Sequence, residues 1–95
     1  MPPDKLLAYL LETAQDLLDT ATYESQTYKA DVLAHWLATL VASNAPELTP
    51  KRLALSDPET GEALEEITGT ALLELTLLLP DGSPVSASCL LRRTP

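Results

Sequence analysis

A leucine-rich stripe near the N-terminus constrains this chain more than any other feature of its sequence. Apolar residues recur every three or four positions and occupy less than half of a helix circumference: Leu6, Leu7, Leu10, Leu11, Ala14, Leu17, Leu18 and Ala21. This period predicts an amphipathic helix from Asp4 to about Ala21. Pro2 and Pro3 lie before it or in its first turn, where a missing N–H costs nothing. The other side carries Lys5, Glu12, Asp16 and Asp19, which we interpret as a solvated surface, with a partner-binding surface as the alternative.

A second helix is predicted from about Thr27, which can cap it, to about Ser43. Residues 20–27 are rich in Thr and Ser and interrupt the periodicity, so we expect a loop or a frayed turn there. Asn44 followed by Pro46 ends the helix. Its apolar side is expected to hold Leu33, Trp36, Leu37, Leu40 and Val41. The short connection favours an antiparallel helical hairpin that needs a second layer to cover it.

The C-terminal third predicts a β-hairpin. Residues 70–79 and 84–92 alternate in polarity around Pro80, Asp81 and Gly82, which suit a type I turn followed by a left-handed Gly and a bulge. This three-residue loop pairs Leu77 with Val85, Leu75 with Ala87, Leu73 with Cys89, Ala71 with Leu91, Thr76 with Ser86 and Glu74 with Ser88. A four-residue loop would set Leu against Ser on the buried face, so the pattern favours the bulged turn.

Three leucines break this alternation: Leu72, Leu78 and Leu90 fall on the otherwise polar face. Contiguous apolar side chains on a sheet usually contact something. We expect the middle segment of the chain to cover them, and the alternatives are a second copy of the protein or another partner.

The middle segment allows two interpretations. Residues 52–56 alternate like a short strand, residues 57–61 suit a turn, and residues 62–67 can return as an edge strand whose glutamates would resist aggregation. The alternative is a short helical turn capped by Thr49, with Pro50 at its first position. We favour the strand pair. The predicted fold is a single α+β domain over residues 1–95, in which a helical hairpin (1–44) packs on one face of an antiparallel meander of three or four strands (45–95).

Charge and composition exclude several classes of partner. Fourteen acidic residues against six Lys and Arg give a net charge of −8, which should repel nucleic acids and anionic membrane surfaces. No stretch of eighteen apolar residues is present to span a bilayer. The single Cys89 and the absence of a signal-like N-terminus indicate a cytoplasmic protein.

Chemically reactive residues are scarce. His35 and Cys89 fall on different predicted elements, so they do not form a nucleophile with its base. Asp31 and His35 are four positions apart and could hold a metal weakly, but an exposed ion pair is the favoured interpretation. Cys89 is interpreted as a small buried hydrophobe, and Trp36 as part of the core. We therefore predict a protein that is not an enzyme, with no cofactor and no metal.

The sequence thus favours a small acidic protein-binding module: an adaptor, an assembly factor or a subunit of a larger complex. A basic protein would suit its charge. The chain has four aromatic residues and no Phe, so Leu and Ala build its core, and a homodimer would bury more apolar surface. The predicted protein-binding residues are Leu72, Leu78, Leu90, Glu12, Asp16, Asp19, Tyr23 and Tyr28. The alternative function is an inhibitor whose carboxylates imitate phosphates and block a DNA- or RNA-binding protein.

Overall fold

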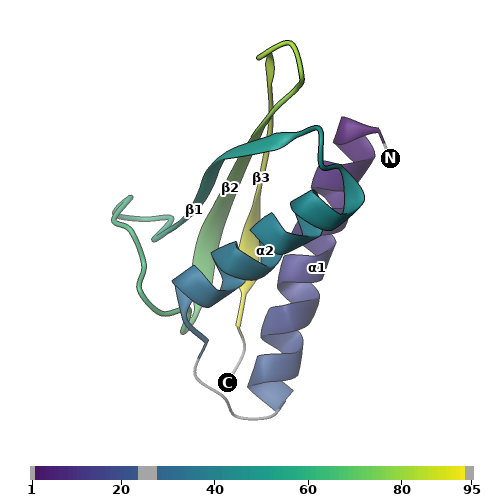
Figure 1. Cartoon of the computed structure of the whole chain (residues 1–95). Helices are drawn as coiled ribbons and strands as arrows, with labels where there is room; N and C mark the ends of the chain where they lie inside the picture. Colours follow the sequence, from purple (N-terminus) through teal and green to yellow (C-terminus); the bar gives the residue numbers. More distant parts are fainter. Residues whose placement is uncertain (1, 24–27, 94–95) are drawn as a thin grey trace.

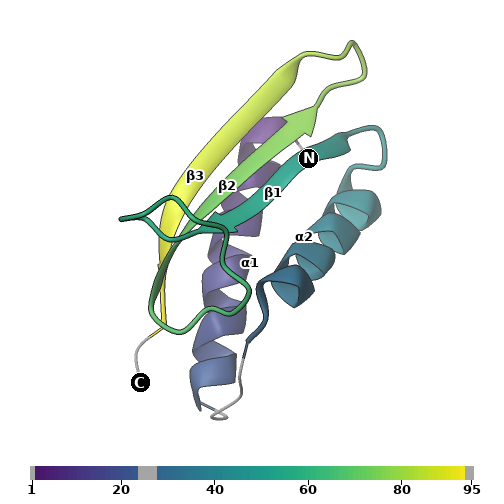
Figure 2. The same ribbon diagram turned by 90° about the vertical axis from the view of Figure 1, so that its left-hand side faces the viewer.

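Two helices cover one face of a three-stranded antiparallel sheet (Figure 1). The computed structural model describes residues 2–23 and 28–93. Its elements follow the order α1 (Pro3–Tyr23), α2 (Ala30–Asn44), β1 (Thr49–Ser56), β2 (Thr70–Leu78) and β3 (Pro84–Arg92), and the strands lie in the order β1-β2-β3. Figure 2 shows both helices on the same side of the sheet, where α1 packs on β3 and α2 on β1. The predicted α+β arrangement is confirmed.

The helix α1 follows the leucine stripe and begins and ends within two residues of the predicted limits. Its buried residues are Leu6, Leu7, Leu10, Ala14, Leu18 and Ala21, while Leu11 and Leu17 are half-buried at the margins. The last turn of α1 contains no basic residue. Instead, Arg93 from beyond β3 donates hydrogen bonds to the Ala21 carbonyl at 3.4 Å and to Thr22 Oγ1 at 3.2 Å. A cation at this position suits the negative end of the helix dipole.

The helix α2 begins later than predicted. Its N-cap residue is Lys29, which makes no side-chain cap, and Thr27 lies outside the described residues. The backbone before β2 caps the helix instead, because the Ala30 N–H donates to the Glu65 carbonyl at 2.9 Å. The Ile67 N–H in turn donates to the Tyr28 carbonyl at 2.9 Å.

The prediction that Trp36 belongs to the core is wrong. The buried ridge of α2 consists of Ala30, Leu33, Leu37 and Val41. Trp36 precedes Leu37 by one position and is therefore rotated about 100° away from that ridge. Its side chain is 51% exposed. The buried stripe of α2 is therefore narrower than the apolar side predicted from the sequence.

The predicted hairpin is confirmed in every pair. Leu77 lies opposite Val85, and the register continues without interruption to Thr70 and Arg92. Gly82 has a φ of 87°, which is the left-handed conformation that glycine adopts without strain. Its N–H donates to the Leu79 carbonyl at 2.8 Å, and the Ser83 N–H donates to Asp81 Oδ1 at 2.9 Å. The hydrogen bond from the Ser83 backbone, together with one from the Ser83 side chain, holds the pKa of the Asp81 carboxyl below its usual range.

The middle segment forms one strand rather than two. The strand β1 begins earlier than expected, at Thr49, and contains a bulge between Pro50 and Arg52. Residues 62–67 make only isolated bridges, in which Ala63 pairs with Ser56 and Glu66 with Lys29. The expected second strand is therefore wrong, since this segment leaves the edge of β1 to cap α2. The alternative helical turn does not form either.

The core lies between the helices and the sheet and is apolar throughout. Among residues 2–23 and 28–93, every buried side chain is hydrophobic. The largest of these are leucines from both layers, together with Ile67 and Val41. In the same ranges, neither helix combines the length and apolarity needed to cross a membrane.

Candidate functional site

The sheet face that points away from the helices carries the three leucines singled out by the sequence. We call it the open face. It is formed by alternate residues of the three strands: Arg52, Ala54, Ser56, Leu72, Glu74, Thr76, Leu78, Ser86, Ser88 and Leu90. Leu72 and Leu90 lie directly opposite each other, and Leu78 lies farther along β2, opposite Pro84. Leu90 is 52% exposed, and Leu72 and Leu78 are half-buried.

The expectation that the middle segment covers these leucines is wrong for Leu90, which is 52% exposed. Residues 62–67 bond instead to β1 and to the start of α2, and the buried Ile67 side chain belongs to the core under the helices. The segment thus contributes to the helical layer.

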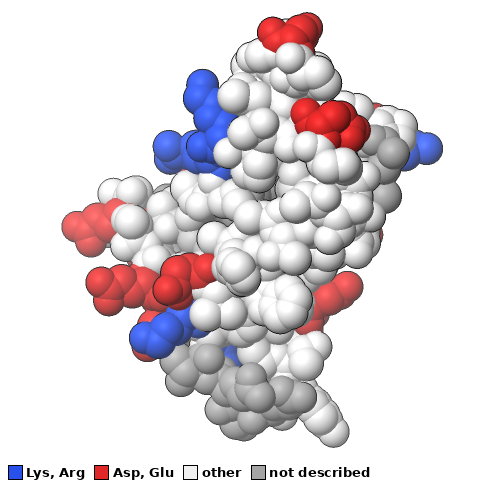
Figure 3. Space-filling model, viewed as in Figure 1, with Lys and Arg blue, Asp and Glu red and all other residues white. Residues whose placement is uncertain are grey.

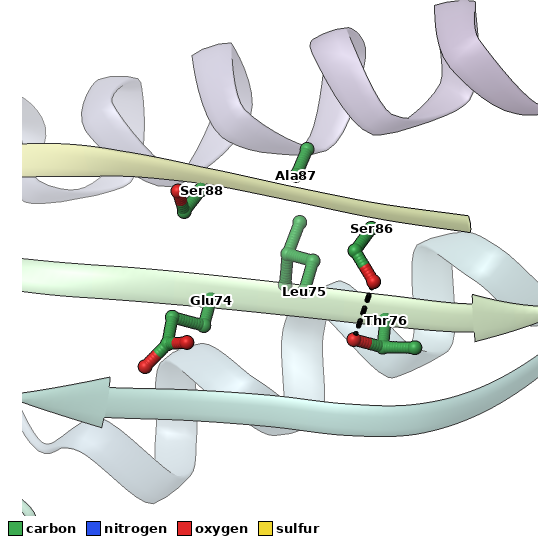
Figure 4. A pocket seen from close by; sticks show the side chains of 6 residues that line it. All are labelled: Glu74, Leu75, Thr76, Ser86, Ala87 and Ser88. Atoms are coloured by element: carbon green, nitrogen blue, oxygen red, sulfur yellow. Dashed lines mark hydrogen bonds between the residues drawn. The ribbon is translucent and has the colours of Figure 1, made fainter. Parts of the chain in front are cut away.

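A shallow hollow of about 260 Å³ adjoins the leucine pair on the open face (Figure 4). Its polar lining comes from Glu74, Thr76, Ser86 and Ser88, and Figure 4 shows Ala87 pointing to the other side, toward α1. The Thr76 and Ser86 hydroxyl groups are hydrogen-bonded at 2.9 Å. Short side chains leave space here, so the hollow can accept a side chain of a partner.

The outer edge of β3 is the second feature of this surface. The Arg93 N–H donates inward to the Gly69 carbonyl at 3.1 Å, whereas the Arg92 backbone points outward. Backbone groups alternate in direction along an antiparallel strand, so those of Ser86, Ser88 and Leu90 also point outward. We call this stretch the β3 edge. Among the described residues, its outward groups have no hydrogen-bond partner.

Gln15 closes the end of this edge. Its amide Nε2 donates to the Arg92 carbonyl at 2.8 Å, and its Oε1 accepts from the Arg92 N–H at 3.1 Å. The same Nε2 donates to Asp19 Oδ1 at 2.9 Å. The Gln15 side chain thus substitutes for one residue of a neighbouring strand. Sequence reasoning missed this residue, because nothing in the helical pattern shows which sheet edge it reaches.

The acids predicted to bind a partner lie on the exposed side of α1. Glu12, Asp16 and Asp19 are all exposed. Asp19 accepts a hydrogen bond from Gln15 at the Arg92 end of β3. A second cluster of acidic residues lies in the connection between β1 and β2. Figure 3 shows its red side chains beside β1, while most of the outer surface of α2 carries no charge. The two acidic groups therefore flank opposite edges of the sheet.

The two predicted tyrosines do not join the open face. Tyr23 is 91% exposed at the end of α1. Tyr28 is half-buried against the core, and this burial raises the pKa of its phenol. Its carbonyl accepts from the Ile67 N–H, and its side chain packs against the core, so Tyr28 contributes to the fold.

The reactive residues remain separate in the structure. His35 is exposed on α2, and Cys89 is half-buried beneath the sheet, where burial raises the pKa of its thiol. The predicted ion pair between Asp31 and His35 is not formed: within the described ranges the ion pair joins Arg52 to Glu74, at 3.7 Å. No group of three His, Cys, Asp or Glu residues in those ranges is arranged to hold a metal ion.

Comparison with known proteins adds no family to this description. No protein-family model matches the sequence, and no curated protein matches it either.

Proposed function

We propose that this chain is a non-enzymatic protein-binding module, such as an adaptor, an assembly factor or a complex subunit, and that it binds through the open face around Leu72 and Leu90. The observation that carries the proposal is the exposure of Leu90, at 52%, opposite Leu72 and beside the β3 edge. Apolar side chains on a sheet face next to an unpaired strand are typical of a surface that meets another chain.

Burial of these leucines by a partner contributes a modest binding free energy. Complete burial of a leucine side chain contributes about 1.5–3 kcal/mol, so covering the exposed half of Leu90 contributes about 1 kcal/mol. The half-buried Leu72 adds less. A partner of measurable affinity therefore also has to use the adjoining hollow or the strand edge, which lie within the same surface.

Phosphate mimicry receives less support. That function needs carboxylates spread over one continuous surface at the spacing of phosphates. Asp16 lies on α1 above β3, whereas Glu62 belongs to the segment that bonds to the far edge of β1. The sheet separates the two groups.

Introduction of a charge on the open face tests the proposal. The variant Leu90→Lys places a cation at the centre of the candidate interface. The variant Val32→Lys is the matched control, because Val32 is similarly exposed, at 43%, on α2. Each protein is used to capture partners from lysate of the source organism at low and at high salt, and the bound proteins are identified by mass spectrometry.

We expect one stoichiometric partner that survives high salt, is lost with Leu90→Lys and is kept with Val32→Lys. Sedimentation analysis of each variant identifies the case in which the partner is a second copy. Capture that is unchanged by Leu90→Lys, or that depends only on low salt, would contradict binding through the open face.

A further inference from the structure

We propose that the β3 edge binds an extended basic segment of the partner, which adds to the sheet as a fourth strand. The inference rests on the proposed function and names the part of the partner that is recognised. An extended segment gains affinity from backbone hydrogen bonds and specificity from alternate side chains.

The first support is the set of available backbone groups. The outward N–H and C=O groups of Ser86, Ser88 and Leu90 form a continuous row, and among the described residues none of them has a partner. The row has defined ends. Pro84 has no N–H at one end, and at the other end Gln15 already occupies the N–H and C=O of Arg92. An added strand therefore has one short stretch on which to pair.

The opposite edge of the sheet is blocked by contrast. In β1, Pro50 and a bulge interrupt the outer edge, and Lys51 is the extra residue. Farther along, the Leu55 carbonyl accepts from the Leu64 N–H at 3.0 Å. The structure protects much of the β1 edge and leaves the β3 edge available.

The second support is charge. A strand added to β3 would turn every second side chain toward the helical layer, alongside α1. The exposed side of α1 carries the acids Glu12, Asp16 and Asp19 together with Lys5, and Glu12 precedes Gln15 by about one turn, on the side of the available row. Lys or Arg at those positions of the segment would face carboxylates. The intervening side chains would lie on the open face next to Leu90, where apolar residues fit.

A second copy of this chain does not suit the site. Pairing β3 with itself would place two copies of α1 over strands about 4.8 Å apart, because α1 packs on β3. Packed helices need 8–10 Å between their axes. The acidic sides of both helices would also meet. A single extended segment avoids both difficulties.

Selection of peptides tests the inference. A phage library of random dodecapeptides is selected on the wild-type protein, and the enriched peptides are then measured against Ser88→Pro and Ser88→Thr. Proline removes the outward N–H of Ser88 without removing a bond to β2, whereas threonine keeps that N–H. Circular dichroism and thermal unfolding establish that both variants are folded, and Ser86→Pro replaces Ser88→Pro where they do not.

We expect peptides with Lys or Arg at every second position that bind wild type and Ser88→Thr alike and bind Ser88→Pro about tenfold more weakly. Peptides that bind Ser88→Pro undiminished but lose affinity for Leu90→Lys would overturn strand addition and leave the proposed function standing. Enrichment of acidic or unpatterned peptides would overturn the charge argument. A dimer of the free protein that Ser88→Pro disperses would identify a second copy as the occupant and would overturn the inference.

Failure of this inference and failure of the proposed function give different results. If no peptide is enriched while the open-face test captures a partner that depends on Leu90, the partner binds by another mode and strand addition is refuted. If both experiments are negative, the proposed function is refuted as well.

Discussion

Replacing Arg93 by Ala should destabilise the fold by an amount unusual for a side chain at the end of the described chain. The guanidinium joins three segments: it donates to the Ile67 carbonyl at 3.1 Å, to Thr22 Oγ1 at 3.2 Å and to the Ala21 carbonyl at 3.4 Å. These bonds connect the end of α1, the backbone before β2 and the residue after β3. The side chain is half-buried, so solvent screens these bonds only in part.

The magnitude follows from these contacts. A hydrogen bond to a charged group contributes about 1.5–3 kcal/mol when buried. Since Arg93 is partly exposed and its bond to Ala21 is long, we expect about 2 kcal/mol for Arg93→Ala in total. A chain of 95 residues unfolds with an entropy of about 200 cal/mol/K, so the melting temperature should fall by about 10 °C.

Thermal and urea unfolding followed by circular dichroism measure this change. The matched control is Arg92→Ala, because the exposed Arg92 side chain makes no hydrogen bond or ion pair among the described residues, and it should cost less than about 0.5 kcal/mol. Arg93→Lys should be intermediate, since one ammonium group cannot reach three acceptors in different directions. Equal stabilities of Arg93→Ala and Arg92→Ala would refute the assigned role.

Three further predictions follow from local structure. Gly82→Ala should cost about 1 kcal/mol or more in urea unfolding because Gly82 has a positive φ of 87°, whereas Gly69→Ala, where φ is not positive, should cost much less. Cys89 should react with iodoacetamide at pH 8 more slowly in the folded than in the unfolded chain, because burial raises the pKa of its thiol. For the same reason stability should decline as the pH rises above the ordinary thiol pKa, and a Cys89→Ala variant should lack this decline. Trp36→Ala should cost less than about 1.5 kcal/mol, against about 2–5 kcal/mol for Leu37→Ala, and acrylamide should quench Trp36 fluorescence readily.

The parts of the fold that were predictable depend on local signals. The stripe on α1 repeats for almost six turns, so its period determines both the element and its buried side. The hairpin register follows from the Pro80–Gly82 loop together with the alternation of its strands, and a shift of one residue would have exposed every buried leucine of β2.

The errors occur where a distant segment decides the outcome. Residues 62–67 alternate weakly, and their backbone caps α2 instead of pairing along β1, as the bond from the Ala30 N–H to the Glu65 carbonyl shows. Trp36 has leucine neighbours along α2, but the buried ridge of the helix consists of Ala30, Leu33, Leu37 and Val41, and Trp36 lies outside it. Neither outcome has a signal in the local sequence.

The candidate site was predictable in its side chains but not in its backbone. The sequence placed Leu72, Leu78 and Leu90 on the polar side of the hairpin, and the structure confirms that placement. The β3 edge depends on the strand order and on the position of α1. The reach of Gln15 to Arg92 spans 77 positions of the chain, and no local pattern reports it.

Amide hydrogen exchange along β3, followed by NMR, shows whether the β3 edge is free to bind a partner. In the free protein we expect rapid exchange at Ser86, Ser88 and Leu90 and slow exchange at the inward-pointing Ala87 and Cys89. A bound partner segment should then slow exchange at the first three. If Ser86, Ser88 and Leu90 were as protected in the free monomer as Ala87 and Cys89, the β3 edge would already be occupied and could not be the binding surface.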